Sequence, residues 1–416
     1  MLTPPTLPLP VRAYNGFRRM ASRVGLPMPS LDVDALLEEA CRQTGLRDFG
    51  PDGFREGLSR LVASLDDEAG LHALGFGIAK RTVSNALEAR LRLYDTVARE
   101  PAIARGAVRR PVFIVGMART GTSILHEVIG QDPTLRVPKT WEVSQPIPPP
   151  ERQNYQTDPR IAACDAELAQ TDRLIPEFRR MHRMAAELPQ EDVAMLALEF
   201  QSMIFEASFR LPSYTAWLHG GGADPGPAYA LHRLFLQVLQ WRCPAERWVL
   251  KTPAHLWDLE ALLAEYPDAC LVQTHRDPLK IMSSLTSLET TLRAMSSDDI
   301  HPKEIAQEWS ALNAQAYDAS VDARERGVVP PDQVIDIHFA EFMSDPFAAI
   351  PRIYEKFDIA YTPEADARMR AYLAAHSTEE HGRHAHRFED TGLDVAEERE
   401  RVKRYQEYFD VPSEVR

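Results

Sequence analysis

The pattern of hydrophobic positions along the chain changes near residue 106. Between about residues 30 and 100, apolar side chains recur every three or four positions, as at Leu58, Leu61, Val62 and Leu65. This spacing places them on one face of a helix and leaves polar side chains on the other faces. We therefore expect residues 1–105 to form a helical N-terminal region.

Beyond residue 106, short runs of β-branched and aromatic residues replace much of that helical spacing. We predict strands at 111–115, 247–250, 269–274 and 333–339. Helical stretches alternate with these runs, and strands that alternate with helices form a parallel sheet covered by helices on both faces. The expected fold is an α/β domain over 106–416, interrupted by a helical insertion at about 144–245.

Composition and charge narrow the possible functions. The chain is 44% hydrophobic and 26% charged, as in globular proteins with a packed core, and its formal net charge is −14. That charge argues against nucleic acid as a partner, because such affinity comes from excess Lys and Arg. The apolar runs are shorter than the roughly 20 residues of a membrane-spanning helix. Four separated cysteines predict reduced thiols in the cytoplasm and no zinc site.

A loop that could bind a phosphate follows the first predicted strand. Gly116-Met-Ala-Arg-Thr-Gly-Thr-Ser123 has the spacing G-x-x-x-x-G, which lets backbone N–H groups surround an anion at a helix N-terminus. A Walker A loop would continue with Lys, and its absence makes ATP or GTP hydrolysis doubtful. Arg119 can present a planar fork to a phosphate instead, and Thr120, Thr122 and Ser123 offer hydroxyl groups. The alternative is a tight turn with an exposed arginine.

A second candidate anion site follows the third predicted strand. Arg276 ends this strand, and Ser284 lies in the second turn of the next helix. Both would be at the carboxyl edge of the sheet, where open α/β folds bind their ligands. Asp277 precedes Pro278, and we expect it to cap the helix, which leaves Arg276 for a ligand. In the alternative interpretation, Arg276 and Asp277 form a local ion pair.

These motifs resemble those of the sulfotransferases that use 3′-phosphoadenosine 5′-phosphosulfate (PAPS), and the bacterial branch of that family most of all. Arg119-Thr-Gly-Thr-Ser123 matches the family loop at every position, with Gly121 at the position of its glycine, and Arg276 and Ser284 match its second motif. The resemblance extends from about 111 to 357, where 335–357 looks like the family's third stretch. It implies a P-loop-like fold, a loop that binds the 5′-phosphosulfate, and an Arg276–Ser284 pair that binds the 3′-phosphate. Such a donor explains the missing Walker lysine and requires no metal.

The resemblance also suggests catalytic residues. Lys251-Thr-Pro-Ala-His255 is similar to a family segment in which Lys contacts the bridging oxygen and His is the base, although two extra residues precede His255 here. Glu142, which follows the helix after the loop, is the rival base, because a carboxyl shielded by Trp141 could accept a proton near neutral pH. Glu142 could instead cap a helix or form a salt bridge. His182 is a third, weaker candidate for the base.

Other segments suggest how the rest of the substrates could be bound. Arg383 and Arg387 lie in a late basic segment that could close on the donor's 3′-phosphate, or could be a solvated turn. Met and aromatic residues at 181–184, 195–209 and 214–218 suit a pliable apolar pocket, or plain core. We expect a small-molecule or lipid-like acceptor with a hydroxyl group. The rival functions are a P-loop kinase or nucleotide hydrolase, and a nucleotide-binding module without catalysis.

Overall fold

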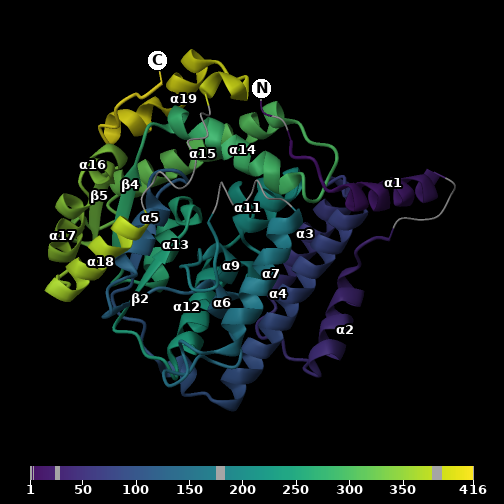
Figure 1. Cartoon of the computed structure of the whole chain (residues 1–416), viewed down its shortest axis with the longest axis horizontal. Coiled ribbons are helices and arrows are strands. Elements are labelled where there is room, and N and C mark those ends of the chain that lie inside the picture. The colour runs from purple at the N-terminus through teal and green to yellow at the C-terminus, as the bar shows by residue number, and fades with distance from the viewer. Residues whose placement is uncertain (1, 3, 24–28, 175–182, 377–386, 416) are drawn as a thin grey trace.

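The central element of the computed structural model is a parallel β-sheet (Figure 1). The structure describes all residues except 1, 3, 24–28, 175–182, 377–386 and 416. Within the described residues the sheet has five strands in the order β2-β3-β1-β4-β5. The strands are β1 (Val112–Val115), β2 (Leu135–Arg136), β3 (Arg247–Lys251), β4 (Cys270–His275) and β5 (Val334–His338). The predicted α/β class is confirmed, and the two-residue β2 is the strand that the sequence pattern did not indicate.

Helices cover both faces of the sheet, which explains why its strands are hydrophobic without interruption. All four residues of β1 and all six of β4 are buried. Side chains of β1 alternate between two cores. Phe113 and Val115 pack in the larger core, and Val112 and Ile114 pack in the core on the opposite face.

The helices of the α/β domain fall into two groups by the core to which they contribute. The larger core contains side chains of α12 (Gly226–Gln240), α13 (Leu259–Glu265), α14 (Pro278–Arg293), α15 (Pro302–Glu325) and α19 (Val395–Tyr408). The opposite core contains side chains of α5 (Thr122–Ile129), α16 (Phe339–Ser344), α17 (Pro346–Lys356) and α18 (Pro363–Ala375). Figure 1 shows α16, α17 and α18 beside β5, on the side of the molecule away from the N-terminal helices.

The N-terminal region is helical, as its spacing predicts. Its helices are α1 (Leu9–Arg23), α2 (Val33–Thr44), α3 (Phe54–Asp67), α4 (Ala73–Arg99) and the short η1 (Ile103–Arg105). The insertion is also helical, with α6 (Thr140–Ser144), α7 (Pro159–Leu174), α9 (Val193–Leu196), η2 (Ala197–Glu199), α10 (Met203–Ser208) and α11 (Pro212–His219). A further hydrophobic core contains residues of both α2–α4 and 197–217. The two helical parts therefore share one core.

A buried ion pair joins these two helical parts. The guanidinium of Arg90 on α4 is fully buried and contacts the carboxylate of Glu199, which is 2% exposed. Arg90 also donates to the carbonyl oxygens of Phe49 at 2.7 Å, Pro51 at 2.8 Å and Leu198 at 3.1 Å. A buried charge needs this degree of compensation, because desolvation is costly.

We predict that Arg90→Ala lowers the free energy of unfolding by about 3–5 kcal/mol, because it leaves the carboxylate of Glu199 buried without its partner. Urea denaturation monitored by circular dichroism measures this change. Arg92→Ala is the matched control, since Arg92 is half-exposed and pairs with Glu88 on the surface of the same helix; we expect a change of at most about 1 kcal/mol there. Equal effects of the two substitutions would contradict the prediction.

Candidate functional site

The loop after β1 has a backbone that glycine makes possible. Gly116 has φ of 154°, and a Cβ atom there would lie 2.1 Å from Oγ1 of Thr274 on the neighbouring strand β4. Gly121 has φ of 90°, in the left-handed region, immediately before α5 begins. Arg119 also has a positive φ, 71°, which is strained for a residue with a side chain. The loop therefore turns sharply and directs the N-terminus of α5 toward the carboxyl edge of the sheet.

Some hydroxyl groups of this loop are buried and others are exposed to solvent. Oγ1 of Thr120 is buried, donates to the carbonyl of Met117 at 2.6 Å and lies 2.7 Å from Oγ1 of Thr274. It stabilises the loop and is not available to a ligand. Thr122 is also buried, whereas the side chains of Arg119 and Ser123 are exposed. Of the predicted loop contacts, those from Arg119, Ser123 and the helix N-terminus are thus accessible to an anion.

The structure brings the two predicted anion motifs together. Nη1 of Arg276, which follows β4, donates to the carbonyl oxygen of Arg119 at 3.0 Å. Desolvation and the nearby charge of Arg276 both lower the pKa of Arg119. Asp277 caps α14 by accepting from the backbone of Leu279 at 3.0 Å, as predicted. Ser284 lies in the second turn of α14 and is partly exposed.

Lys251 is at the end of β3, next to residues 116–123, the predicted phosphate-binding loop, which is called the phosphate loop below. Its side chain is 3% exposed, and Nζ donates to Oγ of Ser123 at 3.2 Å and to the carboxylate of Glu191. Glu191 is about one-quarter exposed. Sequence reasoning missed this carboxylate, because it lies in the helical insertion outside every motif. The carboxyl edge of the sheet thus brings together a cation, a hydroxyl group and a carboxylate, from Lys251, Ser123 and Glu191.

His255 is buried and contacts Asp192, the residue that follows Glu191 in the chain. Its Nε2 lies 2.9 Å from Oδ2 of Asp192, and its Nδ1 lies 2.9 Å from the hydroxyl of Tyr229. The backbone N–H of Asp192 donates to the carbonyl of Lys251 at 3.1 Å. Burial alone would raise the pKa of Asp192, but the hydrogen bond from His255 contributes to lowering it. Since the His255 side chain is 0% exposed, it does not face an acceptor in this structure.

Glu142 has the surroundings of a structural residue. It is 0% exposed, forms an ion pair with Arg136 of β2, and accepts from the hydroxyl of Tyr155 at 2.8 Å and from the backbone of Lys139 at 3.1 Å. These contacts match the capping and salt-bridging alternative of the sequence analysis. Both carboxylate oxygens are engaged, so Glu142 is not presented to an acceptor either.

The other predicted residues take no part in the contacts of Arg119, Lys251 and Arg276 described above, or lie outside the described residues. Arg387 is exposed, pairs with Glu389 and precedes a short helix, η6 (Phe388–Thr391), that packs against α14. Arg383 and His182 lie outside the described residues. Most of the large side chains proposed for an acceptor pocket, including Met195, Phe200, Phe205 and Tyr214, are buried core. On α14, however, Leu288 and Leu292 are partly exposed and share a face with Ser284.

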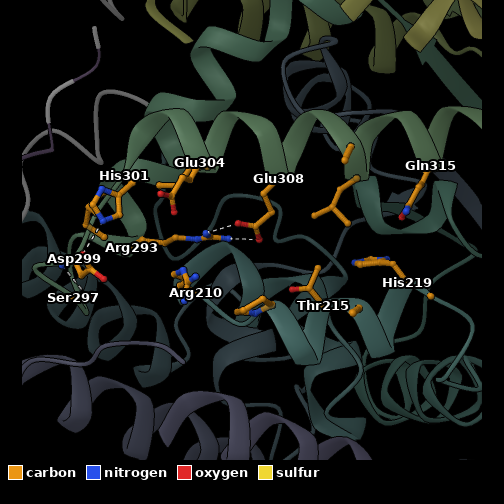
Figure 2. A pocket seen from close by; sticks show the side chains of 17 residues that line it. Arg210, Thr215, His219, Arg293, Ser297, Asp299, His301, Glu304, Glu308 and Gln315 are labelled. Atoms are coloured by element: carbon orange, nitrogen blue, oxygen red, sulfur yellow. Dashed lines mark hydrogen bonds and ion pairs between the residues drawn. The ribbon is translucent and has the colours of Figure 1, made fainter. Parts of the chain in front are cut away.

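A cavity of about 530 Å³ lies elsewhere, between α11, the end of α14 and the first half of α15 (Figure 2). Figure 2 shows the Arg293–Glu308 ion pair across it, with His219 and Gln315 at one end and Asp299 and His301 at the other. Arg293 and Ser284 are nine residues apart and project from opposite faces of α14. The cavity is therefore on the face of α14 opposite to Ser284.

The described residues contain no group of three or more His, Cys, Asp or Glu side chains that could hold a metal ion. None of the helices in this part of the chain combines the length and the apolar character that crossing a bilayer requires. All four cysteines have free thiols.

Several known proteins resemble this chain in sequence and in fold. Residues 111–363 match the model of a sulfotransferase family. The crystal structure of sulfotransferase STF1 from Mycobacterium tuberculosis H37Rv is 32% identical, with a TM-score of 0.79 over 89% of this chain and 98% of that one. Sulfotransferase STF9 from Mycobacterium avium is 29% identical, with a TM-score of 0.85 over 94% and 100%. A relative in Mycobacterium bovis, omega-hydroxy-beta-dihydromenaquinone-9 sulfotransferase Stf3, is 25% identical over 64% of this chain and 67% of its own.

The buried pair of His219 and Glu206 at the cavity predicts a pH dependence of stability. Burial alone would lower the pKa of His219, but the charge and the 2.7 Å hydrogen bond of Glu206 outweigh burial and raise it. Because the unfolded pKa is about 6.5, the pair stabilises fully below that pH and loses its effect as pH rises through the folded pKa.

We therefore expect the stability difference between the wild type and His219→Gln to be largest near pH 6 and to shrink toward pH 9. Urea unfolding at several pH values measures it. The comparison with wild type removes the contributions of other histidines, such as His126 and His232, whose pKa values burial lowers to about 4. A difference that does not change with pH would refute the prediction.

Proposed function

Because this chain belongs to the sulfotransferase family, we propose that it transfers a sulfonate group from PAPS to a hydroxyl of an apolar or aromatic acceptor. The observation that carries the donor assignment is the contact between Arg276 and the carbonyl of Arg119. It joins two cationic motifs at one sheet edge, as a nucleotide with phosphates on both sides of its ribose requires. The local positive charge also suits an anionic donor in a chain whose net charge is −14.

The residues present suit the two ends of that donor. Arg119, Ser123 and the N-terminus of α5 would bind the 5′-phosphosulfate through a planar cation, a hydroxyl and backbone N–H groups. Arg276 and Ser284 would bind the 3′-phosphate. Lys251, which contacts Ser123, would neutralise the oxygen that bridges phosphorus and sulfur as it becomes negative. Arg387, and Arg383 outside the described residues, remain predicted contacts of the 3′-phosphate.

Glu191 is the base that we propose for the transfer. Its carboxylate contacts Lys251 and is partly exposed, so it borders the place where the leaving oxygen and the acceptor must meet. The acceptor oxygen forms a bond to sulfur, its proton passes to Glu191, and the bond between sulfur and the bridging oxygen breaks to release adenosine 3′,5′-bisphosphate. His255 and Glu142 would then have structural roles and no direct part in the reaction. His255 would position Asp192 and thereby Glu191.

The acceptor class rests on two supporting observations. Leu288 and Leu292 continue the face of α14 that begins at Ser284 and are partly exposed, which gives an apolar wall next to the donor. A relative at 25% identity is named for omega-hydroxy-beta-dihydromenaquinone-9, a hydroxyl-bearing molecule with a long apolar part. We infer a small-molecule or lipid-like alcohol. A cytoplasmic location is also proposed, and the free cysteines support a reducing compartment.

Family membership disfavours the rival kinase or nucleotide hydrolase, and the loop also lacks the lysine that those enzymes use. A nucleotide-binding module without catalysis would bind the bisphosphate and sulfonate no alcohol. A lysate treated with the enzyme and PAPS separates these possibilities, since an active enzyme yields products that are heavier by one sulfonate in mass spectrometry.

We expect Arg119→Ala and Arg276→Ala each to weaken binding of adenosine 3′,5′-bisphosphate by about 1.5–3 kcal/mol, the range for a hydrogen bond to a charged group. Isothermal titration calorimetry measures the change. Arg60→Ala is the control, because Arg60 is exposed on α3 and pairs with Glu56. Unchanged affinity in both site variants would defeat the donor assignment.

We expect Glu191→Gln to lower kcat by about 10²–10⁴-fold at saturating donor, as removal of a general base does, with much smaller losses in bisphosphate affinity. The comparison series is Glu142→Gln and His255→Gln, with Glu187→Gln as the control, since Glu187 is exposed and pairs with Lys139. If Glu191→Gln keeps full turnover while Glu142→Gln or His255→Gln abolishes it in a folded protein, the base belongs to the residues that the sequence suggested.

A further inference from the structure

Arg276 already has an anionic partner within the chain. Nε and Nη2 of its guanidinium donate to the two carboxylate oxygens of Glu414, at 3.0 and 3.3 Å. This is the paired arrangement in which arginine also binds phosphate. A second edge of the guanidinium donates to the carbonyl of Arg119, and the ring of Phe339 stacks on it with its centroid 3.9 Å away. Glu414 therefore occupies a position on Arg276 that an incoming phosphate would use.

Several hydrogen bonds hold the backbone around Glu414. The carboxylate of Asp277, 0% exposed, accepts the backbone N–H groups of Glu414 at 2.5 Å and of Val415 at 3.0 Å. Arg399 of α19 donates to the same carboxylate and, at 2.7 Å, to the carbonyl of Val415. Burial alone would raise the pKa of Asp277, but the hydrogen bond from Arg399 and those from the two backbone groups lower it. Val411 is part of the larger hydrophobic core.

The carboxylate of Glu414 is more exposed to solvent than that of Asp277, which holds the backbone beside it. Its side chain is 36% exposed, twice the 18% of Arg276, so leaving the ion pair would return it to water at small cost. A phosphate that carries up to two negative charges would meet repulsion if the carboxylate stayed. If the phosphate replaces the carboxylate of Glu414, the charge of Arg276 is neutralised both before and after the phosphate binds.

We propose that Glu414 occupies the place of the donor's 3′-phosphate on Arg276 and is displaced when that phosphate binds. The proposal rests on the proposed function, because it takes Arg276 as the 3′-phosphate contact. Glu414 then acts as a built-in competitor. It lowers the affinity for nucleotides that carry a 3′-phosphate and leaves unaffected those that lack one, because these have no group to compete for Arg276.

The test compares the binding of two nucleotides to the wild type and to variants of it by isothermal titration calorimetry. The nucleotides are adenosine 3′,5′-bisphosphate and adenosine 5′-phosphate, and the proteins are the wild type, Glu414→Gln and Glu400→Gln. Glu400 is the control, since it is 77% exposed on α19 and pairs with Lys403. Thermal unfolding verifies that each variant folds, and Glu414→Ala repeats the test with a second side chain.

We expect Glu414→Gln to bind adenosine 3′,5′-bisphosphate about two- to fivefold more tightly than the wild type, as removal of a partly exposed ion pair allows, and adenosine 5′-phosphate equally well. Weaker binding of the bisphosphate would overturn the proposal, because Glu414 would then be orienting Arg276 for the phosphate. The same change for both nucleotides, or the same change in Glu400→Gln, would overturn it as a general charge effect.

The experiment also distinguishes failure of this inference about Glu414 from failure of the proposed function. If the wild type and every variant bind the bisphosphate no more tightly than adenosine 5′-phosphate, Arg276 is not a 3′-phosphate contact, and the proposed function and this inference fail together. If the wild type prefers the bisphosphate and Glu414→Gln leaves that preference unchanged, the inference about Glu414 alone fails.

Discussion

The parallel pairing of β1 with β4 is the constraint on which the site depends. Val115 is in register with Gln273, so the two strands end at the same edge of the sheet. This register brings the phosphate loop against Thr274, where a side chain at position 116 would have no space. It also brings Arg276 to the carbonyl of Arg119, 157 residues earlier in the chain. Without this pairing, the two motifs would be separate loops.

Cations at this edge are matched by groups of the chain itself. Lys251 contacts Glu191, and Arg276 contacts Glu414. Such matching is expected where positive charge is withdrawn from water, because an uncompensated buried charge is costly. If the proposed donor binds at this edge, its binding would be an exchange of partners and not a simple addition of charge. The two carboxylates would then help to set how tightly the edge holds the donor.

Features that depend on local sequence were predictable, and features that depend on distant partners were not. The loop at 116–123, four of the strands and the Asp277 cap follow from residues that are adjacent in the chain. Glu142 and His255 occupy suggestive positions in sequence, but their surroundings come from elsewhere: Tyr155 contacts the first, and Asp192, 63 residues away, contacts the second. Glu191 meets Lys251 across 60 residues, and no motif marks it. The strand β2 was not predicted, because a strand of two residues is too short to show an alternation of apolar and polar side chains.

The N-terminal helices, which lie outside the motifs, have a structural connection to the site. The segment that carries Glu191 is held at one end by Lys251 and His255, which bind residues 191 and 192. Seven residues after Asp192, Glu199 is held by Arg90 of α4. Because α9 and η2 span the short distance between these anchors, the N-terminal region stiffens the segment on which Glu191 depends. The helical addition thus supports the carboxylate beside Lys251.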